Sequence, residues 1–265
     1  MQWLAEVGAA SERTAGYVGG LAQICGRSLQ QLVFSPLKRS RMLGRAVHEA
    51  MAVGVAAVPI ISLISFFVGV IIALQGAYEL QRLGAMQIVA SLVAISITRE
   101  LGPLITAIVV IGRSGSAFAA EIGTMRVTEE LDALQTMALD PVSFLVVPKF
   151  LAMMVMVPCL AIWADLMGVL GGSLFGVIGG GFTFGGYLIA TRDALLLRDV
   201  TSGFVKSLVF GIVITAVGCQ EGFSTGAGAE EVGRSTTSAV VISILLVILI
   251  DLVFTALFYL AKGSA

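Results

Sequence analysis

The chain has 265 residues, of which 57% are apolar and only 12% carry a charge, whereas soluble domains average roughly 45–50% apolar and about 25% charged residues. This small number of charged residues could not cover the surface of a water-soluble fold. The composition therefore excludes a soluble globular protein and predicts an all-α polytopic membrane protein. The net charge of −1 gives no overall polarity that would favour nucleic acid as a partner.

Residues 1–49 are expected to form an N-terminal amphipathic segment at the membrane interface. Residues 1–11 contain Glu6 and are too short of apolar length for a cleavable signal, so the later apolar runs are expected to be retained. Apolar side chains then recur at helical spacing, opposite a polar face. The apolar face comprises Tyr17, Val18, Leu21, Ile24, Cys25, Leu29 and Leu32. A basic cluster follows, which would meet anionic headgroups or serve as a solvated connector. It comprises Lys38, Arg39, Arg41 and Arg45.

Five apolar runs are long enough to cross a hydrocarbon core about 30 Å thick at about 1.5 Å per residue. The first run contains Pro59, which removes a backbone donor, so a broken or re-entrant helix and a straight helix are equally good interpretations. The third run is longer than a bilayer requires, so it must tilt, kink or protrude. The runs cover about residues 50–78, 83–112, 150–181, 200–220 and 235–261, within a transmembrane domain over residues 50–265.

Glycines fall at every fourth position of the third run, at Gly168, Gly172, Gly176 and Gly180. On a helix this spacing makes a smooth ridge that lets another helix approach closely. The partner could be another helix of the same chain or a second subunit, and the sequence favours neither.

The distribution of Lys and Arg predicts the orientation, because cytoplasmic connections carry an excess of them. If the N-terminus is inside, the inside segments hold most of these residues: Arg13, Arg27, Lys38, Arg39, Arg41, Arg45, Arg113, Arg126, Lys149 and Arg234. The outside segments hold Arg82, Arg192, Arg198 and Lys262. We therefore expect a cytoplasmic N-terminus and a C-terminus on the opposite side.

Four of the five runs contain ionisable residues, namely Arg99, Glu100, Asp165, Lys206 and Asp251. A charge at membrane depth costs at least about 2.5–3.5 kcal/mol, so such residues normally face a partner or a wet cavity. They could pair structurally and lock the bundle, or they could border a pocket that opens to water.

The connection between the second and third runs predicts a short amphipathic helix over residues 120–137. Its apolar side chains, Val127, Leu131 and Leu134, share one face, and its carboxylates, Glu129, Glu130 and Asp132, lie on others. We expect the apolar residues to supply a buried contact with a soluble partner and the carboxylates to orient it. A helix lying on the membrane surface fits the periodicity equally well.

The sequence shows no centre for catalysis. It contains no phosphate-binding loop and no Gly-x-Gly-x-x-Gly after a strand, so no nucleotide is expected to bind by the usual route. His48 is the single histidine, and the three cysteines lie far apart, so no metal site and no cofactor are expected. The chain is therefore expected not to be an enzyme, and any ATP would be bound by a partner subunit.

Several ordered motifs resemble the MlaE family of ABC permeases, which move phospholipids in the Gram-negative envelope. They are Thr98-Arg99-Glu100-Leu101-Gly102-Pro103, Gly112-Arg113-Ser114-Gly115-Ser116-Ala117, Ala120-Glu121-Ile122-Gly123-Thr124-Met125-Arg126 and Leu139-Asp140-Pro141. The likeness extends to Leu74-Gln75-Gly76, Val205-Lys206-Ser207, and Asp251 followed by Phe254-Thr255-Ala256-Leu257. It covers nearly the whole chain.

The resemblance implies a homodimeric permease of the bacterial inner membrane, with an interfacial N-terminal helix, a broken first membrane segment and a periplasmic C-terminus. It implies three partners, an MlaF-type ATPase, an MlaB-type STAS protein and an MlaD-type MCE hexamer, and a role in outer-membrane lipid asymmetry. Its phospholipid pocket would lie at the dimer centre. By motif matching, the charged residues of that pocket are Arg99, Glu100, Lys206 and Asp251, and its apolar lining is Ile72, Leu80, Leu83 and Leu101. Residues 120–137 match the coupling helix that contacts the ATPase.

Three functions fit these sequence features. A lipid-translocating ABC permease is the leading hypothesis. An ion-coupled secondary transporter could use the intramembrane carboxylates, but no repeated half is visible. A structural membrane anchor for the soluble partners would use the buried charges for assembly alone.

Overall fold

The computed structural model describes residues 16–17, 19–28, 30–31 and 39–263. Within these residues every regular element is a helix, and five stretches are long and apolar enough to cross a membrane. These stretches are Leu43–Arg82, Met86–Val127, Val142–Ile178, Leu197–Phe223 and Ala229–Leu260. The prediction of an all-α polytopic membrane protein is confirmed.

Residues 39–263 form thirteen elements, some of them short or wider than an α-helix; eleven make up the five stretches, and two short helices lie in the connections between stretches. In chain order these are α2 (Arg39–Arg82), η2 (Met86–Ile88), α3 (Val89–Ser96), η3 (Ile97–Leu101), α4 (Gly102–Val110), η4 (Ile111–Gly115), α5 (Ser116–Val127), α6 (Glu130–Thr136), η5 (Val142–Val146), α7 (Val147–Ile178), α8 (Phe184–Ala194), α9 (Leu197–Phe223) and α10 (Ala229–Gly263). The second stretch runs from η2 through α5, and the third from η5 through α7.

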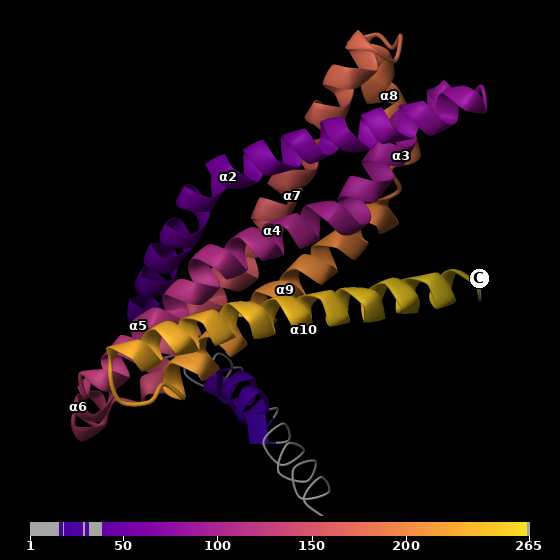
Figure 1. The fold of residues 1–265 in the computed structure, drawn as a ribbon. Helices are drawn as coiled ribbons and strands as arrows, with labels where there is room; N and C mark the ends of the chain where they lie inside the picture. The colour runs from indigo at the N-terminus through magenta and orange to yellow at the C-terminus, as the bar shows by residue number, and fades with distance from the viewer. Residues whose placement is uncertain (1–15, 18, 29, 32–38, 264–265) are drawn as a thin grey trace, which may run out of the picture.

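The first spanning helix is continuous, although Pro59 and the family resemblance left room for a break. Helix α2 runs for 44 residues from Arg39 to Arg82 and passes through Pro59 as one curved ribbon (Figure 1). Proline removes only one hydrogen bond from the helix, and α2 packs against α7 along much of its length, which offsets that loss. The helix also begins earlier than residue 50, where the charge-free run starts.

Two of the π-helical segments end two positions before a proline. The segment η3 precedes Pro103, and η5 precedes Pro148. The ring of a proline inside a helix clashes with the carbonyl group four residues earlier, here that of Arg99 or Phe144. A wider turn at that point relieves the clash while the helix continues. Arg99 and Glu100 therefore stand on an irregular turn in the middle of a spanning segment.

The glycine ridge of α7 packs within the chain. A Cβ atom on Gly168 would press on Ile97, and one on Gly69 of α2 would overlap the carbonyl group of Gly168. Gly172 and Gly176 are both in contact with Tyr187 of α8, which is fully buried. These three ridge glycines thus let α2, η3 and α8 approach α7, and no second subunit is needed to explain them.

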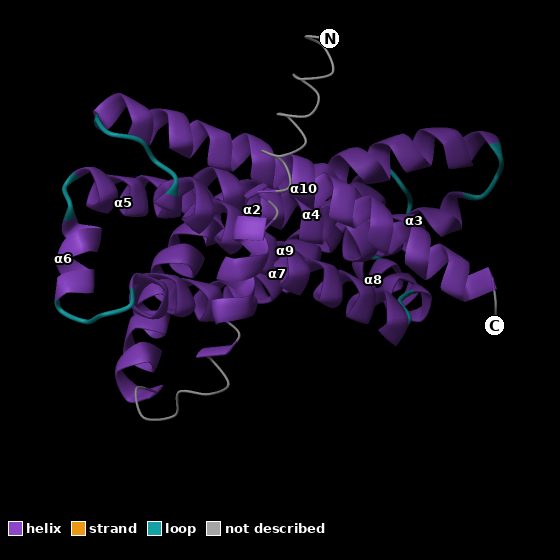
Figure 2. Ribbon diagram, turned by 90° about the horizontal axis from the view of Figure 1, so that it is seen from below, coloured by secondary structure: helices purple, strands orange, loops and turns teal. Residues whose placement is uncertain are grey.

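The molecule has two ends, which we name after their short helices. The α6 end contains α6 and the α9–α10 connection (224–228), and the α8 end contains α8, the first turn of α9 and the last turns of α10. Figures 1 and 2 both show α6 and the end of α10 at opposite ends of the bundle. Helix α8, which lies between the third and fourth apolar runs, was not predicted from the sequence. The Thr183 hydroxyl caps it by accepting a hydrogen bond from the Gly186 N–H group at 3.2 Å.

The N-terminal helical residues pack on the α6 end. Ile24 is buried in an apolar cluster with α5, α6, α7 and α9, and Leu21 and Cys25 pack against the same cluster. Arg45 of α2 lies 3.6 Å from the ring centroid of Phe144. Val18, Leu29, Leu32 and Lys38, which the sequence placed in the interfacial segment, lie outside the described residues.

Candidate functional site

A cluster of ionisable side chains lies toward the α8 end, where three elements meet. The π-helical turn η3 supplies Arg99 and Glu100, α9 supplies Asp199 and Lys206, and α10 supplies Asp251 with Thr255. Four of these residues were predicted as a charged site from their depth in the membrane. The structure brings all four together.

Lys206 is the centre of the cluster and is almost fully buried, with 1% of its side chain exposed. Its Nζ forms an ion pair with Glu100 Oε2, donates to Thr255 Oγ1 at 2.8 Å, and lies 2.9 Å from Asp251 Oδ1. The contact with Asp251 is an ion pair without hydrogen-bond alignment, because no hydrogen bond reaches that oxygen among the described residues. Thr255 Oγ1 also lies 3.0 Å from Glu100 Oε1. Three helices are therefore joined through one ammonium group.

Arg99 has a separate partner that the sequence did not suggest. Its Nε donates to Asp199 Oδ1 at 2.7 Å, and Asp199 Oδ2 accepts from the Leu196 N–H group at 3.1 Å. Asp199 is 2% exposed at its side chain whereas Arg99 is 35% exposed. The Arg99 Nη2 also contacts Asp199 Oδ1, so the buried carboxylate holds one edge of the guanidinium, and the donors on its other side could meet an anionic group.

A pocket of about 200 Å³ opens over this cluster. Its lining combines charged and hydroxyl side chains with two aromatic ones: Arg99, Glu100, Arg198, Asp199, Ser202, Lys206, Thr255, Phe258 and Tyr259. A polar floor beside an aromatic wall suits an amphiphile with a charged headgroup, which would meet Arg99 and Arg198 while its apolar part follows the spanning helices.

The predicted coupling helix is divided into two helices by a tight turn. Helix α5 ends at Val127, Glu129 has a left-handed backbone with φ of 61°, and α6 begins at Glu130. The turn directs Leu131 and Leu134 inward, where they are 7% and 8% exposed and pack with Ile122 and Phe150. This differs from the expectation that these leucines are presented to a partner.

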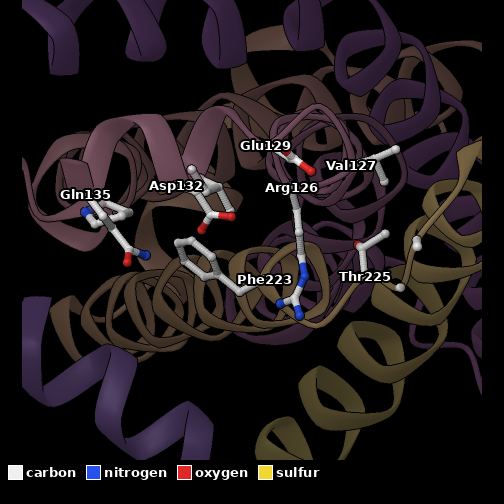
Figure 3. A pocket seen from close by; sticks show the side chains of 11 residues that line it. Arg126, Val127, Glu129, Asp132, Gln135, Phe223 and Thr225 are labelled. Atoms are coloured by element: carbon white, nitrogen blue, oxygen red, sulfur yellow. The ribbon is translucent and has the colours of Figure 1, made fainter. Parts of the chain in front are cut away.

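The outward surface of α6 is acidic with one apolar side chain. Glu129, Glu130 and Asp132 are exposed, Val127 is half-buried, and Met137 is 62% exposed. A hollow of about 560 Å³ lies between α6 and the α9–α10 connection, and Figure 3 shows Arg126, Asp132 and Phe223 around it. The α6 end thus presents both an exposed acidic surface and a hollow to which a partner could bind.

Asp140 caps the helix that follows this connection. Its carboxylate accepts hydrogen bonds from the Val142 and Ser143 N–H groups at 3.4 and 3.2 Å, from Ser143 Oγ at 2.7 Å and from Gln31 Nε2 at 2.6 Å. Burial alone would raise the pKa of Asp140, but these hydrogen bonds outweigh it and lower the pKa below the ordinary value of 3.8. The residue therefore begins a helix as well as ending the preceding connection.

Comparison with known proteins agrees with this architecture. The model of the permease MlaE family matches residues 46–257, which include the whole charged cluster. A probable ABC transporter permease protein of Rickettsia conorii is 38% identical over 253 residues, covering 96% of each chain. The intermembrane phospholipid transport system permease protein MlaE of Haemophilus influenzae is 35% identical, covering 80% of this chain and 82% of its own. The chain belongs to the MlaE permease family.

The relatives of this MlaE-family permease include a chloroplast protein of a plant. The chloroplastic protein TRIGALACTOSYLDIACYLGLYCEROL 1 of Arabidopsis thaliana is 34% identical over 235 residues, covering 89% of this chain and 67% of its own. The family resemblance inferred from the sequence motifs is confirmed, and the chain is an ABC transporter permease.

The apolar residues that the MlaE resemblance assigned to a pocket lie elsewhere in this chain. Ile72 and Leu80 pack in a cluster between α2 and α3, together with Phe175. Leu83 is 77% exposed at the end of α2, and Leu101 is half-buried beside Glu100. None of the four is among the residues that line the described pocket, so their contact with lipid stays a prediction for the assembled MlaE-type complex.

Asp165 of this MlaE-family permease stands apart from the charged cluster. It lies on α7 against Gly102, where a Cβ atom would overlap its carboxylate. One carboxylate oxygen is buried and accepts no hydrogen bond from the described residues. The sequence offered structural pairing or a wet pocket for this residue, and no ion pair reaches Asp165 from the part of the chain that the structure describes.

Sequence reasoning missed Asp199, Thr255 and Met137. Asp199 precedes the fourth apolar run, so its position in the sequence did not mark it as a buried charge. Arg99 in the second run nevertheless indicated that an anion should lie nearby. Thr255 is an uncharged residue one helical turn after Asp251. Met137 was not considered as a contact because the expected apolar face ran through the leucines.

Proposed function

We propose that this permease moves phospholipids between the inner membrane and a periplasmic MCE protein and thereby maintains outer-membrane lipid asymmetry. The observation that carries the proposal is the charged pocket at membrane depth. Its buried Lys206 is paired with Glu100 and Asp251, and Arg99 is held by Asp199, so the outward donors of Arg99 and the Arg198 side chain are the groups that would meet a phosphate group. The printed name of the Haemophilus relative, a phospholipid transport permease, supports the same substrate class.

Free energy would come from a separate ATPase of the MlaF type, because the sequence has no phosphate-binding loop. The ATPase would dock on the exposed carboxylates of α6 and on Met137, beside the hollow of Figure 3. An MlaB-type STAS protein and an MlaD-type hexamer would complete an assembly around a homodimer of this chain. No cofactor other than the partner's ATP is required.

The permease would lie in the bacterial inner membrane with the α6 end in the cytoplasm. The excess of Lys and Arg in the connections on that side supports this orientation. The charged pocket, toward the α8 end, would then open to the periplasm, and the end of α10 would be periplasmic.

The proposal is tested by placing the co-purified complex in liposomes that contain a fluorescent phospholipid and measuring ATP-dependent transfer to the purified MCE ring. Glu100→Ala leaves Lys206 with one carboxylate fewer and is expected to reduce transfer at least tenfold without loss of the bound ATPase. Arg192→Ala, an exposed residue of α8, is the matched control and should transfer at the normal rate.

Three outcomes would contradict the proposal. Transfer without ATP by the permease alone would favour an ion-coupled secondary transporter. Normal assembly with no transfer by the unaltered complex would favour a structural anchor. An unchanged rate of transfer by Glu100→Ala would show that the charged pocket does not take part in lipid transport.

A further inference from the structure

A second buried ion cluster lies near the α6 end, and nothing in the proposed function uses it. Lys149, in the first turn of α7, has 1% of its side chain exposed. Its Nζ lies 2.8 Å from Glu49 Oε1 of α2 and 2.7 Å from Glu121 Oε2 of α5. The same Nζ lies 4.7 Å from the ring centroid of Phe118. One ammonium group therefore joins α2, α5 and α7 near the α6 end of the bundle.

Stability alone is a poor reason for this arrangement. Replacing a buried ion pair with apolar side chains of similar volume is often neutral or stabilising, because burial strips water from both charges. The surrounding cluster is already apolar and holds Ile122, Phe150 and Cys219 in close packing. A charge at this place has a use that a methionine would lack, because it holds carboxylates of two different helices at the same time.

The two carboxylates differ in exposure and stand on different parts of the bundle. The side chain of Glu121 is 49% exposed and that of Glu49 is 24% exposed, so water reaches both from outside while Lys149 stays enclosed. Glu121 is on α5, which continues through the left-handed turn at Glu129 into α6. Any displacement of α6 thus moves one of the two carboxylates that hold Lys149.

The other side of the cluster leads toward the charged pocket. Helix α2 packs along α7, with the carbonyl groups of Gly168 and Phe66 against Gly69 and Gly171, and α7 packs on α9, which carries Lys206. Interdigitated backbones of this kind move as one unit, because small residues leave no soft side chains between the helices.

From these contacts we infer that Lys149 is a positioning residue that transmits displacement of α5 and α6 to α2 and α7, and through them to the lipid pocket. Docking of the ATPase on α6 pulls Glu121, and the ammonium of Lys149 carries that movement to the two long helices. The inference rests on the proposed function, because it assumes that ATP hydrolysis enters at α6.

The test uses the reconstituted complex and the number of phospholipids transferred per ATP hydrolysed. Glu121→Gln and Glu49→Gln keep the side-chain volume and a hydrogen-bond acceptor but remove one charge each. Each variant is expected to keep the ATPase bound and hydrolysing ATP, while lipid transferred per ATP falls about fivefold or more. Lys149→Met should lower the ratio further, and Lys149→Arg should restore part of it. Glu79→Gln, an exposed glutamate of α2, is the control.

A purely structural role predicts a different result. It would lower the yield of folded complex and reduce hydrolysis and transfer in proportion, leaving lipid per ATP unchanged, and that outcome would overturn the inference. If Lys149→Met does not assemble, the two glutamine variants decide the matter by the same ratio. Failure of the unaltered complex to transfer lipid with ATP would contradict the proposed function. A working complex whose variants transfer the same number of lipids per ATP would contradict this inference alone.

Discussion

Lys206 is held by groups from two other elements, so its side chain contributes to structure even where it also serves lipid. Lys206→Met removes the one cation between Glu100 and Asp251 and leaves both carboxylates in place. Breaking a buried pair in this way costs up to about 3–5 kcal/mol, and less where a partner is partly exposed, as Glu100 is. We expect a lower midpoint of thermal unfolding in detergent.

The matched variant removes all three charges. Adding Glu100→Gln and Asp251→Asn to Lys206→Met is expected to recover much of the lost stability, because neither carboxylate then stays as an unpaired charge in this cluster. If the triple variant is no more stable than Lys206→Met, the ion pairs are not what holds the three helices together.

Asp140 gives a pH-dependent prediction. Its pKa is lowered in the folded chain, so its contribution to stability is fully present above the ordinary pKa of 3.8 and is lost as the pH falls through the lower folded value. Asp140→Ala is expected to destabilise the protein by about 0.5–2 kcal/mol at pH 7, as for other lost helix caps. The difference in unfolding midpoint between variant and parent should shrink toward zero below the folded pKa. A difference that persists unchanged at low pH would contradict the assignment.

Charged residues were the easiest part of the site to predict. Arg99, Glu100, Lys206 and Asp251 interrupt apolar runs, where the cost of burial makes any charge informative. Asp199 could not be found in the same way, because it stands at the end of a run where charges are common. Its importance comes from the tertiary contact with Arg99, which no local pattern contains.

At the scale of helices, the close contact between α2 and α7 depends on glycine. A Cβ atom at Gly69 would overlap the carbonyl group of Gly168, which is backbone and cannot rotate away. Gly69→Ala is therefore expected to separate the helices and to reduce the yield of folded protein, measured by size-exclusion chromatography in detergent. Gly112→Ala is the control, since nothing lies within 4 Å of the Cβ atom it would add. Equal yields would show that α2 can shift without penalty.

The exposed side of α6 gives a prediction about docking. Met137→Asp changes a side chain that is 62% exposed and is not needed inside the chain. It is expected to weaken capture of the ATPase at least tenfold while leaving the unfolding midpoint unchanged, because a central apolar anchor carries much of the binding energy. Leu131→Asp would lower the midpoint itself, since Leu131 is buried in the chain's own core. A Met137→Asp variant that binds normally would place the docking surface elsewhere.

Helix boundaries were predictable only where composition changes sharply. The five apolar runs mark the five spanning segments, but helices extend beyond these runs into polar sequence, as α2 does by beginning at Arg39. The division of residues 120–137 into α5 and α6 depends on one left-handed residue, Glu129. Periodicity placed the leucines on one face correctly, yet it could not say whether that face turned toward the bundle or away from it.

For the whole molecule, the orientation can be tested with an impermeant maleimide on intact spheroplasts. In a background with the three native cysteines replaced, Arg192→Cys on α8 is expected to react from outside, and Met137→Cys beside α6 only after permeabilisation. Both positions are exposed in the folded chain, so a difference in labelling reports the side of the membrane. Labelling of both from outside would contradict the five-span orientation.

The ion pair between Glu100 and Lys206 also constrains biogenesis. The two residues are 106 positions apart in sequence, and at about 5–20 residues per second a ribosome needs roughly 5–20 s to make that stretch. The second span therefore enters the bilayer with Arg99 and Glu100 before either counter-ion exists, and the fifth brings Asp251 last of all. Until α9 has been made, Arg99 and Glu100 lack their partners, so we expect the early spans to stay beside the insertion machinery and to be released together after α9 is complete.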